Sequence, residues 1–430
     1  MQKNALVLAG GGSRGSYQIG VWQALRDLSI KIDIVTGTSV GALNAALVTM
    51  GDFDNALEVW ENINTAMVLE VEIDETLPVK QKMNFMIKQF LKDYVRQGGT
   101  NSYPLKQMLD KYCDEDGIRN SPMELGIVVV DKKTLKPLEL YKEDIKDGQL
   151  TDYLLASSSL FPAIKCCEID GGEYIDGGYY DNLPVELATN KGADFVIAVD
   201  LEAIGMVRKE TLKQPKKIMI IKSYWDLGPL LLFDDAVIKR NIRLGYLDTM
   251  KAFNAFDGVA YTFIKNEVPA FIKRERRIID AQGDALGLTY ESKDTNKKEK
   301  MFHLNISNFL KRKYGKEFDL KFTSFIKACA ESAGEIFSVN AEKIYSLSVF
   351  NEVLFENLSK IELVHTAPIE MNSIKNLKET LALFDKSVRT VYIGTLIKKA
   401  VVEGTKVDLL GLSLLLPDEL LAAYYIALIS

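Results

Sequence analysis

Histidine is scarce in this sequence, because 430 residues contain only two, His303 and His365. A serine nucleophile that is activated by histidine needs an imidazole within hydrogen-bonding reach. Both histidines lie far from the N-terminal motifs described below, so a triad would have to take its histidine from the other end of the chain. The scarcity favours chemistry in which a carboxylate, rather than an imidazole, accepts the proton.

Cysteine is also scarce, and the four cysteines are too few for a disulfide framework. None has metal-ligand spacing; they are Cys113, Cys166, Cys167 and Cys329. We interpret them as reduced thiols. The sequence predicts no cofactor and no metal site.

Basic residues are not in excess, since 53 Lys and Arg stand against 59 Asp and Glu, for a net charge of −6. This balance, without a basic stripe, argues against nucleic-acid binding. No apolar run is long enough to cross a bilayer; the longest candidate, 409–429, is interrupted by Pro417 and two acidic residues. Because the first strand pattern begins by residue 5 with no leader ahead of it, we expect a cytoplasmic location. Peripheral membrane contact stays open.

The apolar pattern predicts an α/β fold with three layers, in which helices flank a mostly parallel central sheet. A mainly helical C-terminal region follows, because the chain beyond residue 302 is rich in Leu, Lys and Glu and poor in glycine. We place the domains at 1–265 and 266–430. Homo-oligomerisation through the second region is a further open expectation.

A G-x-S-x-G motif occupies residues 37–41, Gly-Thr-Ser-Val-Gly, between an apolar run and a helical pattern. A serine on such a strand-to-helix turn presents its hydroxyl clear of the backbone. Gly37 and Gly41 allow the two arms of the turn to approach without Cβ clashes. Ser39 is therefore the candidate nucleophile, although the same pattern also occurs in turns that only pack a helix on a strand.

A glycine-rich segment follows the first strand and precedes a helix, reading Gly10-Gly11-Gly12-Ser13-Arg14-Gly15. Successive glycines at a helix N-terminus leave backbone N–H groups that can bind a phosphate or a tetrahedral oxyanion. The same spacing fits a dinucleotide fingerprint, but the acidic residue expected at the end of the second strand is absent. This makes nucleotide binding the weaker interpretation.

Two Asp-Gly-Gly triplets begin at Asp170 and Asp176. Asp170 lies between two short β-prone runs, where Asp-Gly predicts a hairpin turn. Asp176 ends the second run and opens into a glycine loop, so its carboxylate is the candidate general base; a loop aspartate that caps backbone amides is the alternative. With Ser39 it would form a Ser-Asp dyad.

In their order along the chain, these three motifs resemble the patatin-like phospholipase family over roughly residues 3–205, with Asn182-x-Pro184 behind the last motif. The resemblance implies a lipid acyl hydrolase of the phospholipase A or lysophospholipase type, acylated on Ser39 with Asp176 as base. Oxyanion donors would come from Gly11, Gly12 and Ser13, while Arg14 orders the loop.

Two alternatives to a lipid hydrolase remain, a carboxylesterase for soluble esters and a noncatalytic lipid- or nucleotide-binding module. Two segments bear on the substrate. The helical stretch 53–111 would form a lid, an acyl-chain groove or a plain cover for the sheet. The apolar patch 227–233 would be a buried loop or helix start, or would contact lipid.

Overall fold

The computed structural model describes residues 2–74, 76–286, 297–361, 384–405 and 407–430. The chain divides into two compact units, Met1–Phe253 and Asn254–Ser430. The boundary predicted at residues 265 and 266 lies on the C-terminal side of this division. His365 falls outside the described residues.

The first unit contains a sheet of eight strands in the order β5-β6-β3-β2-β1-β7-β8, with β4 paired to β3. The strands are β1 (Asn4–Leu8), β2 (Ile34–Thr38), β3 (Glu124–Asp131), β4 (Pro137–Tyr141), β5 (Cys167–Ile169), β6 (Gly172–Asp176), β7 (Phe195–Val199) and β8 (Lys217–Ile221). β3, β2, β1, β7 and β8 pair in parallel, whereas β4 and β6 are antiparallel to β3. The predicted hairpin at Asp170 is confirmed by the antiparallel pairing of β5 with β6.

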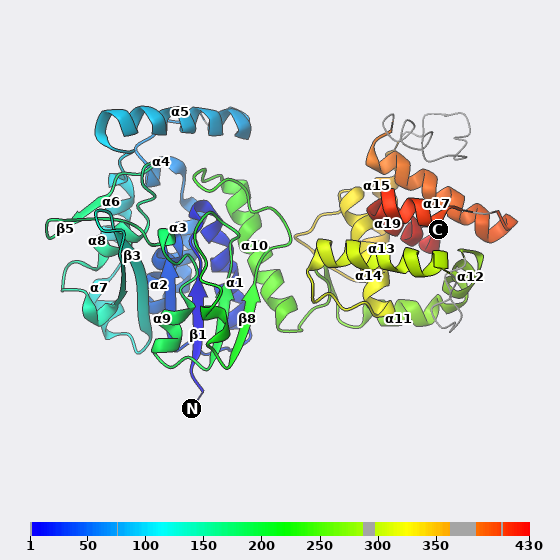
Figure 1. Cartoon of the computed structure of the whole chain (residues 1–430), viewed down its shortest axis with the longest axis horizontal. Helices are drawn as coiled ribbons and strands as arrows, with labels where there is room; N and C mark the ends of the chain where they lie inside the picture. The colour runs from blue at the N-terminus through cyan, green and yellow to red at the C-terminus, as the bar shows by residue number, and fades with distance from the viewer. Residues whose placement is uncertain (1, 75, 287–296, 362–383, 406) are drawn as a thin grey trace. The chain divides into compact units, whose positions relative to one another are not determined.

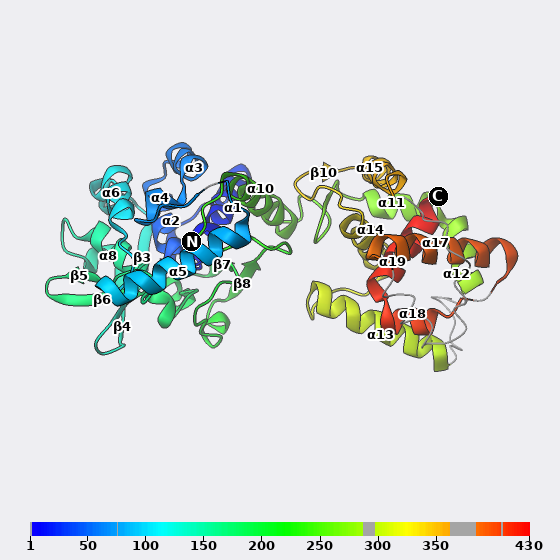
Figure 2. The same cartoon turned by 90° about the horizontal axis from the view of Figure 1, so that it is seen from above.

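The central strands are buried along nearly their whole length, as expected for parallel strands with both faces covered. Helices flank the sheet, and Figures 1 and 2 show them around it. They are α1 (Ser16–Asp27), α2 (Val40–Met50), α3 (Phe53–Asn62), α4 (Thr65–Val68), α5 (Val79–Gln97), α6 (Tyr103–Tyr112), α7 (Glu115–Asn120), α8 (Leu150–Ser157), α9 (Val185–Asn190) and α10 (Asp235–Ala252). The predicted α/β fold class is confirmed.

Close packing between α1 and α10 depends on two glycines. A Cβ on Gly20 would lie 1.8 Å from the Ile242 carbonyl oxygen, and one on Gly245 would lie 2.0 Å from the Tyr17 carbonyl oxygen. The Tyr17 hydroxyl also donates to Asp248 at 2.8 Å. These contacts fix α1 directly behind the glycine segment that precedes it.

The second unit is mainly helical, as the sequence predicts. Its helices are α11 (Glu267–Arg274), α12 (Arg276–Leu286), α13 (Lys297–Tyr314), α14 (Phe322–Ile336), α15 (Leu347–Ser359), α17 (Lys386–Glu403), α18 (Leu409–Leu415) and α19 (Pro417–Ile429). A short parallel pair, β9 (Thr262–Phe263) and β10 (Ile344–Tyr345), completes it. Among the described residues of the whole chain, no helix has the length and apolar character needed to cross a bilayer.

Candidate active site

Ser39 occupies the single residue between β2 and α2, with φ 56° and ψ −131°. A non-glycine residue with positive φ is strained and persists only where its surroundings hold it. Here the Ser39 N–H donates to the Ser157 hydroxyl at 3.0 Å, and that hydroxyl donates to the Val128 carbonyl at 2.7 Å. Ser157 at the end of α8 therefore ties the serine turn to β3.

The two glycines of the motif act as the sequence predicts. A Cβ on Gly37 would lie 2.1 Å from the Gly41 carbonyl oxygen, and one on Gly41 would lie 2.1 Å from the Leu8 carbonyl oxygen. Any side chain at either position would push α2 away from the ends of β1 and β2. The sharp turn at Ser39 therefore needs glycine on both sides.

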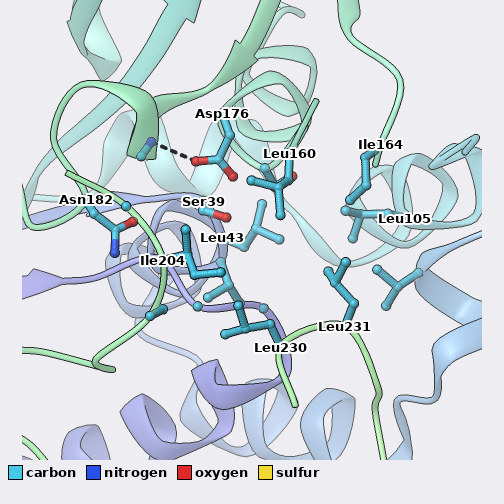
Figure 3. A pocket seen from close by; sticks show the side chains of 18 of the residues that line it. Ser39, Leu43, Leu105, Leu160, Ile164, Asp176, Asn182, Ile204, Leu230 and Leu231 are labelled. Carbon is cyan, nitrogen blue, oxygen red and sulfur yellow. Dashed lines mark hydrogen bonds between the residues drawn. The ribbon is translucent and has the colours of Figure 1, made fainter. Parts of the chain in front are cut away.

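Asp176 reaches the same place from the last residue of β6, opposite Val129 of β3. Its side chain is only 4% exposed. The Gly178 N–H donates to its carboxylate at 2.7 Å. Figure 3 shows the carboxylate directed toward the Ser39 hydroxyl, with the bond from Gly178 drawn as a dashed line.

Burial raises the pKa of Asp176 to about 6, against an ordinary value of 3.8. Hydrogen bonds from the Gly178 N–H and the Ser39 hydroxyl act in the opposite direction and lower this pKa, by less than burial raises it. A carboxylate with this pKa is mostly ionised at neutral pH, yet it accepts a proton more readily than an exposed aspartate.

The glycine segment packs directly against the serine turn, since a Cβ on Gly10 would lie 2.9 Å from the Cβ of Ser39. Three backbone N–H groups of the segment donate to backbone carbonyls. The Gly10 N–H donates to the Asn182 carbonyl, the Ser13 N–H to the Leu230 carbonyl, and the Arg14 N–H to the Gly11 carbonyl. The N–H groups of Gly11 and Gly12 have no hydrogen-bond partner among the described residues, and both glycines line the pocket at Ser39. These two N–H groups are the ones free to bind an oxyanion, whereas that of Ser13 is occupied in this conformation.

The conformation of the segment is held from the opposite side by the loop before α10. The Ser13 hydroxyl donates to the Pro229 carbonyl at 2.6 Å, and Arg14 Nε donates to the Gly228 carbonyl at 2.8 Å. Gly12 has φ 54°, and a Cβ there would lie 1.9 Å from the Leu230 carbonyl oxygen. Arg14 thus orders the loops behind the glycines, while Gly15 completes the one-turn 3₁₀ helix Gly12–Gly15 that leads into α1.

Asn182 is a site residue that sequence reasoning noted only as part of a motif. Its buried side-chain amide donates to the Gly10 carbonyl at 3.2 Å, and its backbone N–H donates to Met206 at 2.6 Å. It therefore links the glycine segment to the loop that follows β7. The signal that could have revealed it is its position six residues after Asp176.

A pocket of about 460 Å³ opens at Ser39 and Asp176. Figure 3 shows Asn182 on one side of it and Leu105 with Ile164 on the opposite side. Its apolar lining comes from segments far apart in the sequence: Val40, Leu43, Trp60, Ile63, Val68, Leu105, Leu160, Ile164, Ile204, Met206, Leu230, Leu231 and Phe233. The patch 227–233 is a loop with Leu227, Leu232 and Phe233 buried, and part of the stretch 53–111 lines the pocket.

Asp170 and His303 lie outside this site. Asp170 is exposed in the β5–β6 turn, where it accepts from Lys146 and Gln149. His303 belongs to α13 in the second unit, beside Phe302. The structure thus brings together one serine, one buried carboxylate and two free N–H groups at the mouth of an apolar pocket.

Comparison with known proteins gives a match to the family model described as patatin-like phospholipase, over residues 6–189. Patatin-like phospholipase domain-containing protein 7 of Rattus norvegicus is 30% identical over 203 residues, which cover 46% of this chain and 13% of that protein. Lysophospholipase NTE1 of Meyerozyma guilliermondii is 28% identical over 204 residues, 46% of this chain and 12% of that protein. The chain therefore matches only a small part of these longer relatives.

Among solved structures, VipD from Legionella pneumophila aligns over 100% of this chain and 92% of its own, with 13% identity and a TM-score of 0.38. A similarity at this level carries no argument about function.

Proposed function

We propose that this chain is a lipid acyl hydrolase acting through a Ser39–Asp176 dyad. The match of residues 6–189 to the family model described as patatin-like phospholipase supports the proposal. The observation that carries the proposal is the buried Asp176 carboxylate, which is directed toward the Ser39 hydroxyl at the pocket (Figure 3). Burial raises the pKa of this carboxyl to about 6. Ser39 directly follows β2 and Asp176 ends β6, so the two residues come from parts of the sheet that are 137 residues apart in the sequence.

The proposed reaction has two steps. The Ser39 oxygen attacks the ester carbonyl while its proton passes to the Asp176 carboxylate, and the departing alcohol then takes that proton. In the second step water attacks the acyl-enzyme, Asp176 accepts the water proton, and Ser39 regains a proton as the fatty acid leaves. The Gly11 and Gly12 N–H groups stabilise the oxyanion in both steps, where one such donor contributes about 3 kcal/mol.

The pocket supports a lipid rather than a small polar ester as substrate. Beyond the dyad its lining consists mostly of aliphatic and aromatic side chains, and its volume is about 460 Å³. Such a lining favours an acyl chain, because burying each methylene contributes about 0.8 kcal/mol. We therefore propose a phospholipid or lysophospholipid whose acyl chain enters this pocket, with the enzyme in peripheral contact with the lipid surface.

The test is labelling by a fluorophosphonate, which reacts with activated serines, combined with hydrolysis of a phospholipid and lysophospholipid panel. We expect the parent protein to be labelled and to release fatty acid, and Ser39→Ala to lose both. Ser158→Ala is the matched control: Ser158 lines the same pocket, but its hydroxyl donates to backbone carbonyls of α8, so labelling should persist. Persistent labelling of Ser39→Ala would refute the proposed nucleophile.

A further inference from the structure

Helix α5 exposes an apolar stripe that no described part of the chain covers. Met83, Ile87, Leu91 and Val95 follow one another at four-residue spacing, which places them along one side of a helix. Their exposed fractions rise along the helix: 40%, 53%, 64% and 84%. Val79 begins the stripe and is 44% exposed. A continuous exposed apolar face of this kind indicates a binding surface.

Basic residues accompany the stripe. Lys88, Lys92 and Arg96 also recur every four residues, one position after the apolar series, and Lys80 precedes them. All four side chains are exposed, and none takes part in an ion pair with the described residues. The sole acidic residue of α5, Asp93, is buried and accepts from Gln89 and Thr100. The charged side chains on the outer surface of α5 are thus all basic, although the chain as a whole has a net charge of −6.

The helix is fixed to the first unit by its other side, where Lys82, Met86 and Asp93 are buried. It crosses the end of the unit toward which β1 runs, the end that carries the serine turn (Figures 1 and 2). Two contacts lead from α5 to the pocket. The Tyr94 and Phe161 rings pack edge to face with 5.9 Å between their centroids, and the Tyr179 hydroxyl donates to the Phe161 carbonyl. Tyr179 lines the pocket.

The pocket lining itself reaches the surface of the first unit. Ile204, Met206 and Tyr179 line the pocket, yet they are 84%, 57% and 45% exposed. Apolar side chains that both line a cavity and face solvent mark its entrance. The exposed stripe of α5 and this entrance belong to the same unit and are linked through Phe161.

We propose that α5 docks on an anionic lipid surface, with its apolar stripe in the acyl region and its basic residues against lipid phosphates. A helix with an exposed apolar side, flanked by lysines and arginine, lies in the plane of a membrane interface. Charge complementarity selects an anionic surface, since none of these four cations forms an ion pair with another described residue. Docking would benefit catalysis by placing the pocket entrance at the lipid, and this benefit rests on the proposed function. The docking itself does not depend on the proposed function.

The experiment measures partitioning of the full chain onto vesicles of phosphatidylcholine with and without phosphatidylserine. Every protein carries Ser39→Ala, so that the lipid stays intact and the result is independent of whether the chain hydrolyses it. We expect binding that needs phosphatidylserine and weakens with salt. Lys88→Gln/Lys92→Gln should weaken it about 25-fold, or about fivefold for each charge. Ile87→Asp/Leu91→Asp should weaken it about tenfold or more.

Matched controls lie on other exposed surfaces. Lys133→Gln/Lys136→Gln removes two exposed lysines from the β3–β4 turn, and Leu135→Asp/Val402→Asp places aspartate at residues that are 69% and 83% exposed. Both should bind like the parent, and thermal unfolding checks that all variants fold. Equal binding by the α5 variants and the parent would overturn the proposal, as would a parent that binds no vesicle. A parent dimer in solution that Ile87→Asp/Leu91→Asp dissociates would also overturn it, by assigning the stripe to a protein contact.

Discussion

At the scale of single residues, the site depends on a balance of opposing effects on one carboxyl group. Burial of Asp176 raises its pKa, while the Gly178 N–H and the Ser39 hydroxyl lower it, and the result is about 6. A lower value would give a weaker base, and a higher one would leave the base protonated at neutral pH. The same burial that suits Asp176 to the proposed role of base also makes its charged form unfavourable in the folded state.

We predict that Asp176→Asn abolishes turnover but stabilises the fold. The folded-state pKa of about 6 exceeds the ordinary value of 3.8. The carboxyl therefore carries no penalty below the unfolded value, and the folded state loses relative stability as pH rises through about 6. Once the carboxyl is ionised in both the folded and the unfolded state, this difference between the two pKa values lowers the free energy of unfolding by about 3 kcal/mol.

The measurement is denaturant unfolding of Asp176→Asn and of its parent at about pH 5 and about pH 8, where linkage predicts the larger gain at the higher pH. Asp170→Asn is the control, because Asp170 is exposed and its pKa is lowered by the hydrogen bond from Lys146. It should keep turnover and gain no stability. If Asp176→Asn were less stable at both pH values, or remained active, the role assigned to this carboxyl would be wrong.

At the scale of elements, the sequence predicted those parts of the site that local patterns encode. The apolar run followed by the G-x-S-x-G motif predicted that Ser39 lies on a strand-to-helix turn. The Asp-Gly hairpin signal predicted that Asp170 is a turn residue, which left Asp176 as the candidate base. The pocket was not predictable in this way. Ile204 belongs to a loop without a period or motif. Leu230 and Leu231 belong to the apolar patch 227–233, which the sequence marked without placing it, and only the path of the chain brings these residues to Ser39.

The oxyanion donors show the same limit. The family resemblance implied N–H donors at Gly11 and Gly12, with Ser13 as a further candidate. The Ser13 N–H instead donates to Leu230 at 2.7 Å. A partner so distant in the sequence leaves no trace in the local pattern.

α6 supplies Leu105 to the side of the pocket away from Asn182 (Figure 3), and this position should set the length of acyl chain that fits. We predict that Leu105→Trp lowers kcat/KM for long-chain esters about tenfold or more, since one methylene in a pocket is worth about 10–200-fold. Short-chain esters, which do not reach Leu105, should be hydrolysed as before. A panel of esters of increasing chain length measures this, and a uniform loss across the panel would contradict it.

At the scale of the whole molecule, the three motifs lie in one unit and His303 lies in the other, while His365 comes later still in the sequence. Ser39, Asp176 and the glycine segment belong to Met1–Phe253, a unit that contains no histidine in its sequence. The helical character of the second unit was predictable from its composition, but its role was not, because no motif of known chemistry occurs there. Its part in oligomerisation, like the cytoplasmic location, stays a prediction.

This separation leads to a prediction about proton transfer. If Asp176 is the sole acceptor of the Ser39 proton, the double variant His303→Asn/His365→Asn should hydrolyse lipid esters at nearly the parent rate over the whole pH range. His303 packs against Phe302 at 5.6 Å between ring centroids, so a modest loss of stability in the second unit is expected and thermal unfolding should register it. Activity is therefore measured well below the unfolding temperature. A hundredfold or greater fall in kcat in a folded double variant would mean that an imidazole acts as base, and the dyad would have to give way to a triad.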